Sequence, residues 1–237
     1  LGPGATNLVT GVADANMDHA PVVAISGQAG TNRLHKESHQ VLDLEQMFRS
    51  ITKYSSRLLT PNIIPEVVRK AFDLAQTEKM GACFIEFPEN IAEMDIIAAP
   101  LPVRQAAIPE PPGEQVTQAA EIISKAKNPI ILAGNGVVRA GAWSQLADFA
   151  AQLNIPVANT FMAKGVLPWE YELSLLSIGL QMHDYVQCGF DQSDLVIAIG
   201  YDFPEYAPAL WNPQYNQHII HMDFTPSEVD RAYQPAV

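Results

Sequence analysis

Short, continuous apolar runs alternate with helical patterns along this chain, and this alternation restricts the possible folds more than any other feature. A strand inside a parallel sheet reads as such a run, because helices cover both of its faces. The sequence therefore predicts an α/β fold made of open parallel sheets with helices on both faces. Strands are expected at residues 21–26, 82–88, 129–133, 155–158, 194–200 and 217–223, and helices at 65–79, 114–127 and 142–154.

A proline-rich segment at residues 98–113 divides this alternation into two parts. Proline fixes φ and removes a backbone donor, so the segment sustains neither a helix nor a central strand and is typical of a semi-rigid linker. With 237 residues, the chain has room for two domains. We expect two three-layer units, at residues 1–97 and 114–237, each built on an open parallel sheet.

Both ends of the sequence lack the features of complete termini. The chain starts at Leu1 without an initiator methionine or a targeting pattern, and its last residues form no capping element. It is therefore expected to be an internal piece of a longer polypeptide.

Composition excludes several classes of partner and site. The formal charge of -12 would repel a phosphate backbone, so nucleic acid is not an expected partner. The apolar runs are far shorter than the roughly 20 residues that cross a bilayer, so no membrane partner is expected. Cys83 and Cys188 have no metal-ligand spacing. They predict no disulfide and a reducing, cytoplasmic compartment.

Two glycine-containing segments are candidates for binding sites. Gly2-Pro3-Gly4 opens a helix of small residues that is expected to end near His19. Its glycines either cradle an anion at the positive end of that helix or serve turn geometry, which the residues alone favour. Gly134 and Gly136 follow the strand at 129–133, where open α/β sheets bind dinucleotides. The third glycine of the dinucleotide fingerprint is missing, so a structural turn is again favoured.

The loop at residues 27–40 is the unusual one, because many polar and titratable groups follow directly after a buried strand. Loops in that position often carry function. His39 can act as a donor or general acid near neutral pH, and Gln40 can orient a carbonyl or carboxylate. A solvated surface loop is the alternative. The other histidines are scattered singly, so no metal site is predicted.

Several motifs in the same order resemble one family. They are Gly2-Pro3-Gly4-Ala5-Thr6-Asn7, an Ala13-Asp14-Ala15 helix, a strand ending in Gly27-Gln28, His39-Gln40, and Ile51-Thr52-Lys53-Tyr54, which matches a strand of the family. Together they resemble the pyrimidine-binding domain of thiamine-diphosphate-dependent acetolactate synthases. The His-Gln form and the segment from Gly200 to Asn212 resemble the catabolic type of that family. The resemblance extends over essentially the whole chain.

The resemblance implies condensation of two pyruvates, or of pyruvate with 2-oxobutanoate, with loss of CO2 to give 2-acetolactate. It implies His39 and Gln40 as catalytic residues that face thiamine diphosphate across a subunit interface of a homodimer or homotetramer. It implies cofactor contacts from Gly2, Pro3, Gly4, Asn7, Gln28, Gly134 and Gly136. In the family, the activating glutamate lies upstream of the Gly-Pro-Gly turn, and the magnesium-diphosphate site lies in a carboxy-terminal domain. The chain alone is therefore expected to be inactive.

Residues 114–237 resemble the central domain that binds FAD in biosynthetic members of the family. Two departures argue against FAD here. The family's Gly-Met-His-Gly is replaced from Gly179 to Asp184, and its Arg-Phe-Asp-Asp-Arg becomes Tyr201-Asp202-Phe203-Pro204-Glu205, which removes two arginines. Two other functions stay open. One is a non-catalytic nucleotide-binding or assembly module, and the other is a thiamine-dependent decarboxylase or carboligase for another 2-oxo acid.

Overall fold

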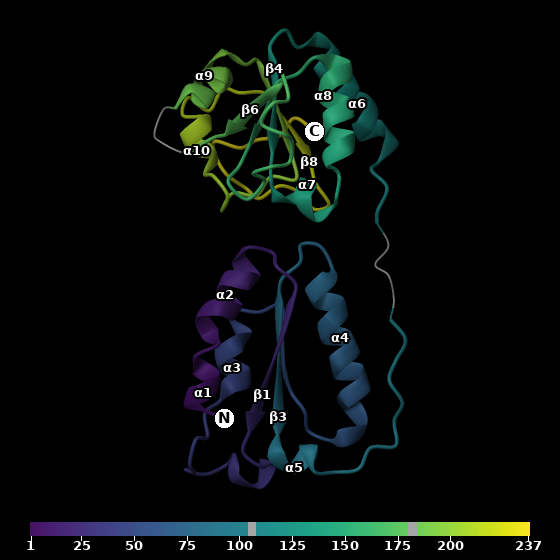
Figure 1. Cartoon of the computed structure of the whole chain (residues 1–237), viewed down its shortest axis with the longest axis vertical. Helices are drawn as coiled ribbons and strands as arrows, with labels where there is room; N and C mark the ends of the chain where they lie inside the picture. Colours follow the sequence, from purple (N-terminus) through teal and green to yellow (C-terminus); the bar gives the residue numbers. More distant parts are fainter. Residues whose placement is uncertain (104–107, 180–183) are drawn as a thin grey trace. The chain divides into compact units, whose positions relative to one another are not determined.

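The structure, a computed structural model, describes residues 1–103, 108–179 and 184–237. The chain divides into two compact units, Leu1–Ile108 and Pro109–Val237. Each unit contains its own sheet (Figure 1). The division falls inside the proline-rich segment.

The first unit is built on a three-stranded sheet in the order β1-β3-β2. Strand β1 (Val22–Gln28) pairs with β3 (Ala82–Pro88) from Val22 opposite Ala82 to Gln28 opposite Pro88. Strand β2 (Tyr54–Arg57) pairs with the other side of β3. Both pairings are parallel, so the strands end at the same edge, and the residues that follow them gather there.

Alternate side chains of β3 supply two cores on opposite faces of this sheet. Cys83 and Ile85 pack against α4 (Ile64–Gln76). Ala82 and Phe84 pack on the other face against α2 (Val9–Met17) and α3 (Leu44–Arg49), and Figure 1 shows these helices opposite α4. The unit is therefore a three-layer sandwich. Its remaining short elements are α1 (Pro3–Thr6), the 3-10 turns Thr31–Arg33 and Pro61–Ile63, and α5 (Glu89–Ala92).

The second unit is built on a five-stranded sheet in the order β6-β5-β4-β7-β8, and every pairing in it is parallel. Its two faces are covered by different helices, with separate apolar cores. The strands are β4 (Pro129–Ala133), β5 (Val157–Asn159), β6 (Ser174–Ser177), β7 (Leu195–Ile199) and β8 (Ile219–Met222). One face carries α6 (Gly113–Lys125), α7 (Asn135–Arg139) and α8 (Trp143–Leu153), and the other carries α9 (Tyr185–Gln192) and α10 (Pro208–Trp211).

The predicted fold class is confirmed, since both sheets are parallel and have helices on both faces. The strand expected at Ile51-Thr52-Lys53-Tyr54 starts later than predicted, because β2 begins only at Tyr54. The Thr52 hydroxyl instead donates to the Phe48 carbonyl at 2.7 Å and closes the end of α3. Strand β6 and helices α9 and α10 were not predicted. The helix expected to end near His19 ends at Met17.

Candidate active site

The first candidate site lies where β1 and β3 end in the first unit. Gln28 at the end of β1 stands opposite Pro88 at the end of β3, and the polar loop at residues 29–43 follows β1. In open α/β sheets, ligands bind at this carboxyl edge. The loop therefore leaves the sheet at the position where a site is expected.

The structure brings the Gly2-Pro3-Gly4 turn against the His39-Gln40 end of this loop. Gly2 has φ +41°, and a Cβ there would overlap the Gln40 carbonyl group. Only glycine fits this position without displacing the loop. Gln40 itself has φ 59°, a backbone conformation that residues with side chains rarely adopt and that is concentrated at functional sites. Two motifs that are distant in sequence thus meet at one edge of the sheet.

The predicted site residues differ in their exposure. Pro3, Gly4, Asn7, His39 and Gln40 are exposed, so their polar groups are open to a ligand. Gly2 and Gln28 are buried. The predicted cofactor contacts of these residues stay predictions.

The Gln28 side chain is directed into the unit. Its amide nitrogen donates to Glu86 Oε1 and, at 2.8 Å, to the Leu42 carbonyl. Its amide oxygen accepts from the Ala29 backbone N–H at 2.9 Å. Both ends of the amide form hydrogen bonds within the chain, so Gln28 links the buried Glu86 to the loop backbone at Leu42.

Glu86 is a charged residue in the middle of the apolar strand β3, and its side chain is fully buried. One carboxylate oxygen accepts from Gln28, and the other accepts from Nε of Arg57 on β2. Arg57 also forms an ion pair with Asp43, with 3.3 Å between Nη2 and Oδ1. Partial burial opposes the charge on Arg57, but the hydrogen bond and the charge of Glu86 raise its pKa. A buried carboxylate needs such partners, because an unpaired one is strongly destabilising.

The first half of the loop is held by α5. The Glu89 carboxylate accepts from the Gly30 backbone N–H at 3.1 Å and pairs with Arg33 at 3.2 Å. Asn90 accepts from the Thr31 backbone N–H at 2.8 Å. Arg33 in turn donates to the Ser38 hydroxyl at 2.9 Å. These bonds connect the start of the loop to the residue just before His39.

The second candidate site is at the carboxyl edge of the second sheet, where a partly buried carboxylate occupies the end of β4. Glu205 accepts from the Asn135 backbone N–H at 2.9 and 3.1 Å and from the Asp202 backbone N–H at 3.1 Å. It also accepts from the Thr160 hydroxyl. These are the backbone and hydroxyl donors that a bound phosphate would need. An internal carboxylate already uses them.

Gly134 and Gly136 pack against the end of β7. A Cβ at Gly134 would overlap the Gly200 carbonyl and the Tyr201 Cα, and one at Gly136 would lie 2.6 Å from the Gly200 Cα. The Gly136 N–H donates to the Gly200 carbonyl at 2.8 Å. This close approach of two backbones accounts for glycine at both positions. Their predicted contact with a cofactor stays a prediction.

Burial raises the pKa of Glu205 above its ordinary value, although its hydrogen bonds from Thr160, Asn135 and Asp202 oppose the shift. A carboxyl group with a raised folded-state pKa stabilises the fold most at low pH, and this stabilisation is lost as pH rises through that pKa. Between about pH 4 and about pH 7, we therefore expect Glu205→Gln to gain stability relative to the unsubstituted chain. Urea unfolding at both pH values measures the difference. A stability difference that does not change with pH would show that this carboxylate is not desolvated.

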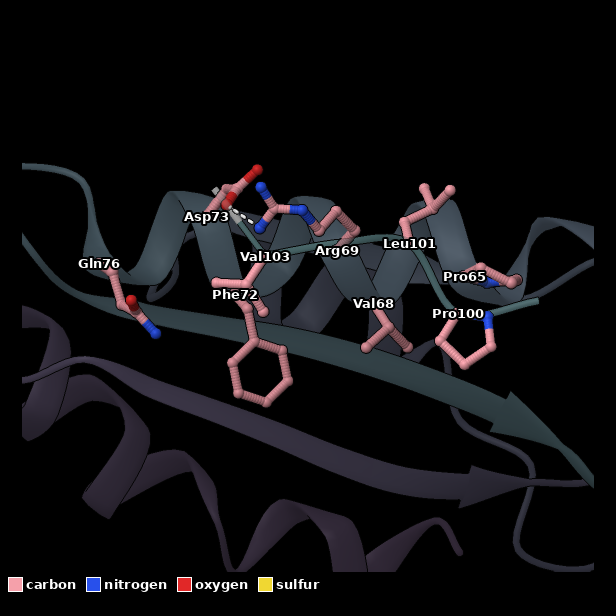
Figure 2. Close-up of a pocket in the computed structure, with 9 residues that line it drawn as sticks. All are labelled: Pro65, Val68, Arg69, Phe72, Asp73, Gln76, Pro100, Leu101 and Val103. Carbon is pink, nitrogen blue, oxygen red and sulfur yellow. Dashed lines mark hydrogen bonds and ion pairs between the residues drawn. The ribbon is translucent and has the colours of Figure 1, made fainter. Parts of the chain in front are cut away.

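Two hollows lie away from these sites, and none of the predicted site residues lines either of them. The first, of about 200 Å³, is a mostly apolar groove between α4 and the segment at residues 100–103 (Figure 2). In Figure 2 the Arg69–Asp73 ion pair lies along this groove. The second, of about 450 Å³, is lined mainly by polar residues, among them Asp194 and His218, which precede β7 and β8.

Two further properties bear on the chemistry. Within residues 1–103, 108–179 and 184–237, no three His, Cys, Asp or Glu side chains converge as a metal site would require. No helix in the same ranges is long and apolar enough to cross a membrane. Residues 180–183, where one of the departures from the FAD-binding pattern lies, are outside the described residues.

Sequence reasoning missed the acidic residues that organise both sites. Glu86 had a signal, because it interrupts an otherwise apolar strand, and a charge there needs a partner. Glu89 and Glu205 had no such signal. Their partners are positions such as Gly30 and Asn135, which are 59 and 70 residues away in the sequence.

Both units are similar in sequence to domains of known proteins. Residues 116–237 match the model of the thiamine pyrophosphate enzyme central domain, and residues 1–47 match that of the N-terminal TPP binding domain. The acetolactate synthase large subunit of Corynebacterium glutamicum is 36% identical over 100% of this chain and 38% of that protein. Glyoxylate carboligase of Escherichia coli O157:H7 is 30% identical over 99% of this chain and 40% of that protein.

A solved structure of a thiamin diphosphate-dependent enzyme from Mycobacterium smegmatis has the same fold. The TM-score is 0.78 and the sequence identity is 23%, over 92% of this chain and 43% of the other. The chain therefore spans about two fifths of the length of the proteins that it matches.

Proposed function

The chain belongs to the thiamine pyrophosphate enzyme family, and from this premise we propose that it is part of an acetolactate synthase. The reaction would condense two pyruvates, or pyruvate with 2-oxobutanoate, and release CO2. The observation that carries the proposal is the meeting of the Gly2-Pro3-Gly4 turn with His39-Gln40 at the carboxyl edge of the first sheet. The similarity to an acetolactate synthase large subunit over the whole chain supports it.

Thiamine diphosphate would supply the electron sink for decarboxylation, and the protein would supply positioning and electrostatics. The exposed residues Gly4, Asn7, His39 and Gln40 would hold it, and they offer the uncommitted polar surface that such a cofactor needs. His39 would donate a hydrogen bond or a proton, and Gln40 would orient a carbonyl or carboxylate of the 2-oxo acid. We place a subunit interface at this edge, in a homodimer or homotetramer.

The second unit would work without FAD. A flavin dinucleotide needs hydrogen-bond donors for its pyrophosphate, and the donors at the end of β4 are already taken by Glu205. The residues present therefore do not fit that group. Magnesium and an activating glutamate would come from segments that the longer relatives have. The two free thiols, Cys83 and Cys188, are in keeping with a reducing cytoplasm.

The test is a pyruvate-to-acetolactate assay on the whole gene product that contains this chain, with and without thiamine diphosphate, magnesium and FAD. We expect acetolactate only when thiamine diphosphate and magnesium are present, the same rate with or without FAD, and no flavin absorbance in the purified protein. Silence with pyruvate would reject the proposal. A rate that depends on FAD would reject the role given to Glu205.

One relative favours a second candidate function. Similarity to a glyoxylate carboligase supports a thiamine-dependent carboligase for another 2-oxo acid. The same assay with glyoxylate in place of pyruvate distinguishes the two. A protein that binds thiamine diphosphate but is silent with both acids would instead be a non-catalytic module.

A further inference from the structure

We infer that Glu86 is a positioning residue that fixes the His39-Gln40 end of the loop for the reaction proposed above, and the inference rests on that proposed function. Glu86 is buried in the middle layer of the first unit and is not among the exposed residues that would meet a ligand. Its effect on the site would pass through two side chains.

The first connection runs through Gln28. Glu86 Oε1 accepts one hydrogen of the Gln28 amide, and the other hydrogen goes to the Leu42 carbonyl at 2.8 Å. The amide oxygen is fixed by the Ala29 N–H at 2.9 Å. Both ends of the Gln28 amide are therefore held, and one of its hydrogens bonds the loop backbone at Leu42.

The second connection runs through Arg57. Its Nε donates to Glu86 Oε2, and its Nη2 lies 3.3 Å from Asp43. Asp43 also accepts from the Gln46 backbone N–H at 3.2 Å, as the N-cap of α3. The two oxygens of Glu86 thus hold Leu42 and Asp43, the residues that follow His39-Gln40 by two to three positions.

Charge and geometry explain why glutamate suits this position. Two donors, one from Gln28 and one from Arg57, converge on the carboxylate, and only a group with two acceptor oxygens satisfies both. In Glu86→Gln, one oxygen becomes an NH2 group that faces a donor. Gln28 must then rotate and lose its bond to Leu42, or the bond to Arg57 must break. The first change frees the loop backbone at Leu42, and the second weakens the hold of Arg57 on Asp43.

A second substitution, at Arg57, is expected to restore the connection from position 86 to Leu42. Glutamine at position 57 would place an amide oxygen where arginine has Nε, because both atoms are bonded to Cδ. In the double variant Glu86→Gln with Arg57→Gln, the amide at 86 accepts from Gln28 and donates to position 57. The connection to Leu42 is restored, although the ion pair to Asp43 is lost.

Hydrogen exchange of the whole gene product tests the loop directly. In Glu86→Gln, we expect amides in the peptide at residues 38–44 to exchange about tenfold faster, since one buried hydrogen bond is lost. The double variant should recover the part of this protection that depends on the bond to Leu42, while the part that depends on the Arg57–Asp43 pair stays lost. Asp73→Asn, which removes an ion pair on α4 of the same unit, should leave that peptide unchanged. Unchanged exchange at 38–44 in Glu86→Gln would overturn the inference.

The apparent activation constant for thiamine diphosphate is the second measurement. It should rise about tenfold in Glu86→Gln and fall part of the way back in the double variant, because a displaced loop lowers affinity for the bound group. A merely structural role would lower the amount of active protein and leave this constant unchanged, which would overturn the inference. If the unsubstituted protein makes no acetolactate, the proposed function fails, while the exchange data still decide the role of Glu86 in the loop.

Discussion

Replacing His39 and Gln40 together by alanine is expected to lower acetolactate formation by about 10² to 10⁴-fold. Both side chains are exposed next to the Gly2 turn, where a ligand at the carboxyl edge of the sheet would meet them. Removal of a positioned donor and of an orienting amide takes away interactions with the reacting group. The measurement is the initial rate with pyruvate in the whole gene product, at saturating thiamine diphosphate and magnesium.

His35→Ala is the matched control, because His35 is an exposed histidine of the same loop. It should keep its rate within about twofold, since exposed substitutions away from special contacts usually have small effects. For the same reason, the thermal unfolding midpoint of the protein with both His39→Ala and Gln40→Ala should stay near that of the unsubstituted protein. If the protein with both His39→Ala and Gln40→Ala keeps its rate and its affinity for thiamine diphosphate, then His39 and Gln40 are not part of the active site.

Sequence reasoning identified the strands whose sequences are continuous apolar runs, including β1, which is an edge strand with Ile25 exposed and is not buried on both faces as its sequence suggested. Strands β4 and β7 are almost fully buried, and in a parallel sheet such strands must be apolar along their whole length. Strand β6, by contrast, is at the edge of its sheet and is only partly buried. Its sequence Ser174-Leu175-Leu176-Ser177 therefore carries no continuous apolar run. The same holds for β2 at the edge of the first sheet, whose start was misplaced.

The candidate site also contains residues that the sequence indicated and residues that only the structure shows. The residues of the Gly2-Pro3-Gly4 turn and His39-Gln40 came from motifs that are local in sequence. The acidic residues that hold the loops depend on contacts over long separations, such as 58 positions between Gln28 and Glu86. A carboxylate in a sequence gives no information about which donors surround it in the fold. Only the structure shows that Glu86 and Glu205 are each surrounded by several donors.

Gly134→Ala is expected to destabilise the second unit by about 3 kcal/mol or more. The new methyl group would overlap the Gly200 carbonyl and the Tyr201 Cα, which are backbone atoms of a buried strand end. A flexible side chain can move aside, but here the strands β4 and β7 would have to separate. Their ladder includes the bond from the Gly134 N–H to the Ile199 carbonyl at 2.9 Å. The substitution therefore acts on the centre of the five-stranded sheet.

Tryptophan fluorescence during urea unfolding measures this effect selectively, because Trp143, Trp169 and Trp211 all belong to the second unit. Trp211 is buried among Tyr201 and Tyr233 and should report loss of packing. Gly113→Ala is the control. A Cβ at Gly113 meets nothing within 4 Å, and alanine suits the first turn of α6, so its stability should be unchanged or about 0.5 to 1 kcal/mol higher. Equal unfolding midpoints for the two variants would contradict the close approach of β4 and β7, and with it the packing reason for glycine at position 134.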